Sequence, residues 1–231
     1  MLKTVLALLF TSAAAQQPTV CPIRKNIQLP MMKDFNVAQF IGPEPYYELA
    51  YHDKTQPLTC GCQIARKSLW DKAPKDTIYD DWSIQCPYND AAPLKGLIYN
   101  TPLMFNFTDE LGVLDGWSPL SGPIGYPDTV VAFGPPDVAG DPYRWALEFQ
   151  CDEVDGVMVF YAVNFYSRAR VGAQATRNFN EMQIAAAQSG IDVYWNNDPD
   201  YHLKMVDHTN CKYREDRKTE AEPAEVEEFL N

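Results

Sequence analysis

The stretch Asp34-Phe-Asn-Val-Ala-Gln-Phe-Ile-Gly42-Pro-Glu-Pro-Tyr46-Tyr47-Glu48-Leu-Ala50 decides the fold. An aromatic-flanked turn ends at Gly42, and a strand-like run with paired tyrosines and a Glu between apolar residues follows it. This order is typical of a small β-barrel, in which an aromatic residue closes one end and the first strand lines a cavity. The first functional hypothesis is therefore carriage of an apolar small molecule.

The first fifteen residues have the pattern of a secretory signal peptide. A basic residue at Lys3 precedes the apolar run Val5–Phe10, and Ala13-Ala14-Ala15 forms a small-residue cleavage site. The apolar run is too short to span a bilayer, so we expect no transmembrane segment. Residues 1–15 are expected to be removed after Ala15 or Gln16, which leaves a secreted chain of roughly 215 residues. Residues 16–211 are expected to form one barrel domain, and residues 212–231 an acidic, disordered tail.

The cysteines and the net charge exclude several classes of function. All six cysteines follow the signal peptide, and an even number in a secreted chain predicts three disulfides, although counting leaves the pairing open. Cys60-Gly-Cys62 has no matching His/Cys pair at ligand spacing, so no metal site is expected. The net charge of −12 argues against nucleic acid and anionic membranes as partners. Asn106-Phe-Thr108 is a glycosylation acceptor sequence, so Asn106 should lie at the surface if it is used.

Short aromatic and β-branched segments, separated by Pro and Gly, fill the first 145 residues and predict an all-β barrel or sandwich. The stretch Leu111–Pro127 is rich in Gly and Pro and is expected to be a long loop. The expected strands are Tyr46–His52, Gln63–Trp70, Thr77–Cys86, Leu94–Tyr99, Leu103–Thr108 and Thr129–Phe133.

The clearest hairpin and helix come late in the chain. Tyr143–Cys151 alternates between apolar and polar residues, and an Asp-Gly turn joins it to Val157–Tyr166. This second strand is apolar on both faces, so it needs one cover inside the barrel and another outside. The helix Thr176–Ser189, with Thr176 as N-cap and Gly190 as C-cap, is expected to pack on its outer face.

Several of these segments resemble the lipocalin family, and within it most closely apolipoprotein D and the bacterial outer-membrane lipocalins. The resemblance runs from about Cys21 to Cys211. Its motifs are Gly42…Tyr46-Tyr-Glu-Leu-Ala50, Trp145-Ala-Leu-Glu-Phe-Gln-Cys151, Phe165-Tyr-Ser-Arg-Ala-Arg170 and Ser189-Gly-Ile-Asp-Val193. It implies an eight-stranded antiparallel up-and-down β-barrel with a C-terminal α-helix packed outside. The chain departs from the family where Glu44-Pro45 is inserted and where Tyr46 replaces the usual Trp.

The resemblance also implies the disulfide pairing and the floor of the barrel. Related lipocalins pair the equivalents of Cys21 with Cys151 and of Cys62 with Cys211, which leaves Cys60 with Cys86. Strand alternation places one side of each strand in the lumen, with Tyr46 and either Arg168 or Arg170 at the floor. A buried Glu48 would then need a donor from an arginine or a Tyr hydroxyl. The expected ligand-binding residues are Tyr46, Glu48, Ala50, Trp145, Leu147, Phe149, Met158, Phe160, Asn164 and Tyr166.

These residues predict a secreted carrier that binds a lipid, sterol, retinoid, carotenoid or tetrapyrrole without covalent chemistry or a cofactor. The main alternative is an enzyme similar to the xanthophyll de-epoxidases, lipocalins that act on carotenoids with carboxylate acids. Glu48, Asp53, Asp80 and Asp81 are the carboxylates that could serve. The Cys-rich N-terminal domain and the long Glu-rich C-terminal region of those enzymes are not found in this sequence. A filled barrel that binds only proteins is a third hypothesis, and the oligomeric state stays open.

Overall fold

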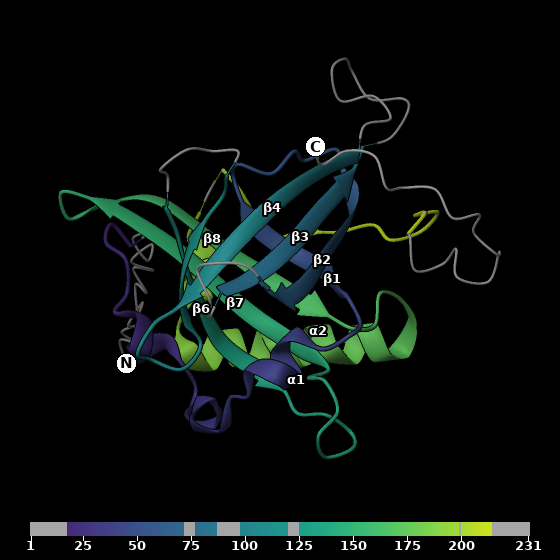
Figure 1. The fold of residues 1–231 in the computed structure, drawn as a ribbon. Helices are drawn as coiled ribbons and strands as arrows, with labels where there is room; N and C mark the ends of the chain where they lie inside the picture. The colour runs from purple at the N-terminus through teal and green to yellow at the C-terminus, as the bar shows by residue number, and fades with distance from the viewer. Residues whose placement is uncertain (1–17, 72–76, 87–97, 120–124, 199, 214–231) are drawn as a thin grey trace, which may run out of the picture.

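The computed structural model describes residues 18–71, 77–86, 98–119, 125–198 and 200–213 (Figure 1). The expected signal peptide and most of the expected acidic tail lie outside these residues, so both stay predictions.

Eight antiparallel strands close into a barrel, as the sequence predicts (Figure 1). Each strand pairs with the next along the chain, and β1 closes the barrel by pairing with both β8 and β2. The strands are β1 (Tyr46–Asp53), β2 (Gly61–Leu69), β3 (Thr77–Gln85), β4 (Ile98–Phe107), β5 (Val113–Trp117), β6 (Gly125–Gly134), β7 (Trp145–Val154), β8 (Val157–Ser167) and the short β9 (Lys204–Met205).

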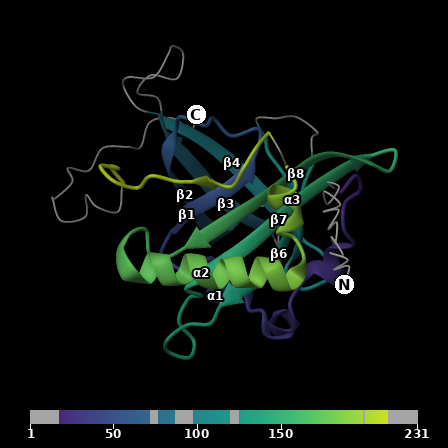
Figure 2. The same ribbon diagram turned by 180° about the vertical axis from the view of Figure 1, so that it is seen from behind.

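Helices cover one end and one side of the barrel. Two 3-10 turns, η1 (Arg24–Ile27) and η2 (Pro30–Asp34), precede α1 (Val37–Ile41), whose N-terminal amides are capped by the Asn36 side chain. Helix α2 (Gly172–Ser189) lies across the outside of β6, β7 and β8 (Figure 2), and α3 (Val193–Asn196) follows it.

The predicted helix is confirmed, but its expected N-terminus is wrong. Helix α2 begins at Gly172, four residues before Thr176. The Thr176 hydroxyl donates to the Gly172 carbonyl inside the first turn and therefore caps nothing. Gly190 ends the helix at φ +76°, a left-handed conformation that favours glycine.

The middle of the barrel differs from the expected strands. The expected segments Leu94–Tyr99 and Leu103–Thr108 are replaced by one strand, β4, although residues 94–97 lie outside the described part. Pro102 does not break β4. At this position β4 pairs with β3, but its pairing with β5 begins only at Met104. No hydrogen bond to β5 is therefore lost through the missing N–H of Pro102. The expected loop Leu111–Pro127 contains β5 and the start of β6.

The C-terminal segment is inserted between β1 and β2 at the open end of the barrel. β2 pairs with β1 only at Tyr46 and Tyr47, whereas β9 pairs with the same edge at Ala50 and Tyr51. The Cys62 amide donates to the Asp207 carbonyl, which links β2 to this segment. The expected disulfides Cys21–Cys151, Cys60–Cys86 and Cys62–Cys211 are all confirmed.

Candidate ligand-binding site

The closed end of the barrel is sealed by packed aromatic rings and one arginine. The guanidinium of Arg168 lies 3.8 Å from the centre of the buried Tyr46 ring, and Phe40 packs against the same ring. Arg168 Nη2 donates to the carbonyls of Phe40 and Ile41, at 2.9 Å each. Tyr46 and Arg168 therefore form the floor as expected, whereas Arg170 stacks outside the barrel on Tyr47.

A buried ionic cluster fills the lower half of the barrel above this floor. Lys67 Nζ lies 2.8 Å from Asp80 Oδ2 and 3.2 Å from Glu148 Oε1, and all three side chains are buried. Burial alone would lower the pKa of Lys67, but Asp80, Glu148 and Asp128 raise it by more, so the ammonium stays charged. Three rings surround Lys67 Nζ at 5.1–5.4 Å from their centres: Phe40, Phe105 and Tyr166.

The cluster holds several buried carboxyls around one ammonium group. That single positive charge cannot balance all of the carboxyls in their ionised form. Burial raises the pKa of Asp128 to about 6, against the lowering effects of Lys67 and Arg24. Burial also raises the pKa of Glu148 well above its ordinary value, and the neighbouring Asp128 and Asp80 raise it further. Asp128 and Glu148 thus compete for the positive charge of Lys67.

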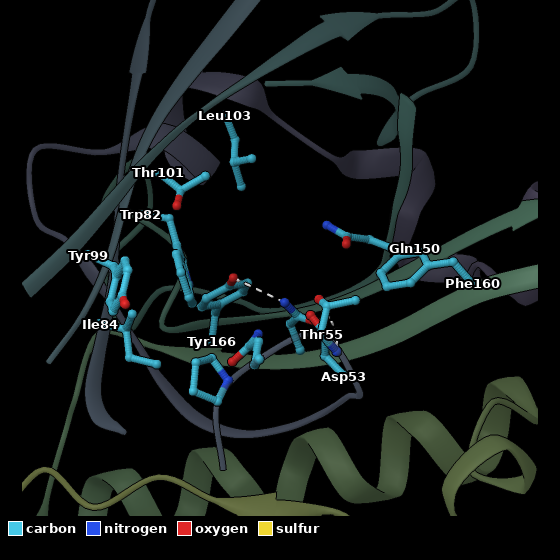
Figure 3. Close-up of a pocket in the computed structure, with 13 residues that line it drawn as sticks. Asp53, Thr55, Trp82, Ile84, Tyr99, Thr101, Leu103, Gln150, Phe160 and Tyr166 are labelled. Carbon is cyan, nitrogen blue, oxygen red and sulfur yellow. Dashed lines mark hydrogen bonds between the residues drawn. The ribbon is translucent and has the colours of Figure 1, made fainter. Parts of the chain in front are cut away.

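A cavity of about 360 Å³ occupies the open half of the barrel above the cluster (Figure 3). Tyr166 lies at its inner end, where the phenol oxygen accepts a hydrogen bond from Asn164 Nδ2 at 3.2 Å. Asp53 lies near the loop after β1, and its Oδ1 accepts hydrogen bonds from the Thr55 amide and hydroxyl. The lining residues are Asp53, Thr55, Gln56, Pro57, Trp82, Ile84, Tyr99, Thr101, Leu103, Gln150, Phe160, Asn164 and Tyr166.

Glu48 is fully buried beside this cavity, between Tyr166 and the lining residues Gln56 and Trp82. Neither of its carboxyl oxygens has a hydrogen-bond partner among the described residues, so the expected donation by an arginine or a Tyr hydroxyl is wrong. Burial raises the pKa of Glu48 well above its ordinary value, and the nearby Asp53 raises it further. Burial and the Asp53 charge thus favour the neutral carboxyl, against the lowering effect of the neighbouring Gln56 and Trp82 side chains, and a neutral carboxyl needs no cationic partner.

Five of the ten expected ligand-binding residues lie inside the barrel. Phe160, Asn164 and Tyr166 line the cavity. Glu48 lies next to the cavity, and Tyr46 lies at the floor below the ionic cluster.

The other five expected residues lie outside the barrel wall, in the core beneath α2. Trp145, Leu147 and Phe149 pack there with α2 residues such as Met182, while Ala146, Glu148 and Gln150 take the inner face of β7. Alternation shows which residues share a face, but the apolar face proved to be the one that the helix covers. Met158 packs against the same outer core.

Ala50 also belongs to this outer core, although Glu48 two residues earlier points inward. The pairing of β1 with β8 shifts between Glu48 and Ala50, which marks a β-bulge. The extra residue reverses the alternation, so Ala50 no longer shares a face with Tyr46 and Glu48.

Much of the cavity wall comes from strands that sequence reasoning did not assign to the site. Trp82 and Ile84 come from β3, and Tyr99, Thr101 and Leu103 come from β4. Alternation along Thr77–Cys86 does group Trp82 with Ile84. However, nothing in the sequence fixed the register of these strands, so their inner face could not be chosen.

The remaining expectations concern the surface and metals. Asn106 is half-buried in β4, and its Oδ1 accepts a hydrogen bond from the Thr77 hydroxyl at 2.8 Å. In the described part of the chain, no three His, Cys, Asp or Glu side chains are grouped so that they could hold a metal ion. Within the same residues, no helix has the length and apolar character needed to cross a membrane.

No protein-family model matches the sequence, and no curated protein matches it either. Solved structures do match the fold. Apocrustacyanin C1 is 13% identical with a TM-score of 0.57, and the match covers 88% of this chain and 96% of that one. H1 crustacyanin from the lobster Homarus americanus is 16% identical with a TM-score of 0.55, over 89% and 96% of the two chains.

Apocrustacyanin C2 also matches the fold, with 12% identity and a TM-score of 0.55, and the match covers 85% of this chain and 92% of that one. These proteins are lipocalins. The chain has the lipocalin fold. At this level of identity the likeness concerns the fold alone, so the function has to be argued from the cavity and its residues.

Proposed function

We propose that this protein is a secreted carrier that binds one small hydrophobic molecule, without covalent chemistry, in the cavity of the barrel. The observation that carries the proposal is the cavity of about 360 Å³ between the ionic cluster and the open end. A pocket of this size, with aromatic walls and a few polar groups, is typical of small-molecule sites.

The walls suit an apolar ligand with a small polar part. Trp82, Leu103 and Phe160 offer apolar surface, and burying about 200 Å² of apolar ligand surface would contribute roughly 5 kcal/mol. Asn164 and Gln56 offer polar groups that can orient the molecule. Lipids, sterols, retinoids, carotenoids and tetrapyrroles are the classes that we would test.

Trp82 provides a direct test, because it is the tryptophan that lines the cavity among the described residues. A ligand from this panel should quench protein fluorescence, and Trp82→Phe should remove most of the quenching while ligand absorbance still reports binding. Trp70→Phe is the matched control, because Trp70 lies after β2 and outside the cavity lining. If no member of the panel binds, or if quenching persists in Trp82→Phe, the proposed site is wrong.

An enzyme similar to the xanthophyll de-epoxidases is the second candidate, and one observation favours it. Asp53 lines the cavity and Glu48 is buried beside it, and burial raises the pKa of each carboxyl, as acid catalysis near neutral pH requires. Asp80 is instead held by Lys67, and Asp81 lies 3.9 Å from Arg66. Ascorbate-dependent conversion of violaxanthin at low pH, lost in Glu48→Gln, would favour this candidate over the carrier.

Three further parts of the proposal rest on sequence. Secretion rests on residues 1–15, and N-terminal sequencing of the mature protein would test it. Glycosylation at Asn106 rests on the acceptor triplet, and a mass shift after glycosidase treatment would test it. Similarity to the apolipoprotein D and bacterial branch rests on the motifs around Tyr46 and Trp145.

A further inference from the structure

Glu48 is the feature of the cavity that neither the fold nor simple apolar packing requires. Its side chain is 0% exposed, and both carboxyl oxygens lack hydrogen-bond partners among the described residues. It lies beside Gln56 and Trp82 of the cavity wall and opposite Tyr166 in the β1–β8 pairing. A buried polar group without a partner is costly. The neighbouring Gln56 and Trp82 side chains can act on this carboxyl as donors, which leaves an acceptor for a protonated Glu48 to be supplied by a ligand.

The charges around Glu48 favour its neutral form. Burial raises the pKa of Glu48 most, and repulsion from Asp53 on the same strand and from Glu148 on β7 raises it further, whereas the neighbouring Gln56 and Trp82 side chains lower it. From the C-terminal segment, His208 Nε2 contacts the Glu48 backbone carbonyl at 2.8 Å rather than the carboxyl. A neutral carboxyl carries an O–H donor as well as an acceptor oxygen.

The cationic groups of the barrel interior are already engaged below the cavity. Lys67 is held by Asp80 and Glu148 in the ionic cluster, and Arg168 is bonded to the carbonyls of the floor. Among the described residues that line the cavity there is no Lys or Arg. A carboxylate ligand would therefore enter a site with no positive partner and with the carboxyls of Glu48 and Asp53 nearby.

The inner end of the cavity also has an open acceptor. Asn164 Nδ2 donates to the Tyr166 hydroxyl, which fixes the amide, while Asn164 Oδ1 has no partner among the described residues. An open donor on Glu48 and an open acceptor on Asn164 together match a hydroxyl group. The carbonyl oxygen of a ligand could accept a hydrogen bond from Glu48, but it has no hydrogen to donate to Asn164.

On the basis of the proposed carrier function, we propose that the cavity selects a neutral amphiphile, an alcohol, aldehyde or ketone. Its oxygen accepts a hydrogen bond from the Glu48 carboxyl, and the carboxylate with the same carbon skeleton is excluded. Glu48 thus determines ligand class rather than general affinity. The apolar walls bind the carbon skeleton, and the polar groups at the inner end recognise the ligand oxygen by hydrogen bonding.

Two ligand series test this selectivity at pH 7. One is retinol, retinal and retinoic acid, and the other is dodecanol, dodecanal and dodecanoic acid. Dissociation constants of the wild-type protein are measured by displacement of a fluorescent apolar probe. The alcohol and aldehyde of each series should bind at least about a hundredfold more tightly than the acid.

Variants of Glu48 separate recognition from packing. Glu48→Gln keeps a donor and should bind retinol within about threefold of wild type, whereas Glu48→Met lacks one and should bind it about tenfold more weakly. Binding of the hydrocarbon anhydroretinol should be the same in both variants. Glu44→Gln, in the exposed loop before β1, is the control for loss of one carboxyl.

The outcomes distinguish this inference from the proposed function. If the acids bind as tightly as the alcohols, or if Glu48→Met leaves retinol binding unchanged, the role of Glu48 is overturned while the carrier function stands. If the apolar probe binds but no member of either series displaces it, the inference is overturned while the carrier function stands. If the probe does not bind the wild-type protein either, the carrier function fails, and the inference fails with it. The wild-type comparison needs no variant, so it holds even if Glu48→Met does not fold.

Discussion

Lys67→Met would test whether the ionic cluster holds the lower half of the barrel together. The side chain is buried with Asp80 and Glu148 at 2.8 and 3.2 Å, and three aromatic rings surround the ammonium. Methionine keeps most of the volume but removes the charge, so the buried carboxyls lose their cation. Removal of one partner from a buried ion pair costs about 3–5 kcal/mol, and we expect a loss of this size.

Urea unfolding at pH 7, followed by far-UV circular dichroism, measures this loss directly. Adding Asp80→Asn to Lys67→Met should restore part of the stability, because one carboxyl then no longer needs a counter-charge. The coupling between the two substitutions should be about 1–3 kcal/mol. Lys25→Met is the matched control, because this side chain is 73% exposed and lies 3.9 Å from Glu110; its effect should stay within about 0.5 kcal/mol.

A loss of less than about 1 kcal/mol in Lys67→Met, or strict additivity with Asp80→Asn, would refute this reasoning. Either result would mean that the cluster is hydrated or rearranges freely. The cavity would then lack the fixed inner end on which the proposed ligand selectivity depends.

Three other perturbations probe separate parts of the structure. The pKa of Asp128 is raised to about 6, so the folded state binds this proton more tightly than the unfolded state does. The free energy of unfolding should therefore fall as the pH rises from about 4 to 6. Asp128→Asn should remove up to about 3 kcal/mol of this fall, measured by urea unfolding across that range. Gly134→Ala would place a Cβ 2.2 Å from Trp145 Nε1 and should lower stability by about 1–3 kcal/mol in thermal unfolding, whereas Gly125→Ala, whose nearest contact is 3.9 Å away, should change little. Replacing Cys62 and Cys211 by Ala removes a disulfide that joins residues 149 apart and should lower the free energy of unfolding by about 5 kcal/mol. The same change at Cys60 and Cys86, which are 26 residues apart, should lower it by about 3.5 kcal/mol. Equal losses in urea unfolding would contradict the chain-entropy account.

The barrel could be predicted because it depends on patterns that the chain carries locally, whereas the disulfide pairing followed from the resemblance to lipocalins. The Gly42–Ala50 stretch shows where the first strand begins, and the Phe165–Arg170 motif shows where the last barrel strand ends. Helix α2 was predicted partly from Gly190, whose left-handed conformation ends it. The strand that contains Pro102 was missed, since a proline breaks a strand only where both edges are paired.

The site was predicted only in part, because alternation assigns residues to a face without saying what covers that face. Trp145, Leu147 and Phe149 formed the obvious apolar face of their strand, but α2 covers it from outside. The polar residue between them, Glu148, points inward to Lys67. A buried ion pair between β2 and β7 cannot be read from either strand alone.

The β-bulge in β1 set a second limit. It separates Glu48, which faces the interior, from Ala50, which faces α2, and it leaves no clear mark in the sequence. The stretch that began the sequence analysis therefore contributes a floor residue, Tyr46, and the carboxyl at the inner end of the cavity, but not a continuous ligand-binding wall.

The central claim is that a small molecule occupies the cavity above Glu48. Native mass spectrometry of the protein purified from its own source tests this claim most directly. The variant Leu103→Trp, which fills the cavity, is measured in the same way. Its control is Leu69→Trp, which makes the same change at a β2 residue that is 60% exposed. The account predicts a one-to-one small-molecule adduct that denaturation releases, that Leu69→Trp retains and that Leu103→Trp loses. A bare chain mass in every sample, or an adduct that persists in Leu103→Trp, would contradict it.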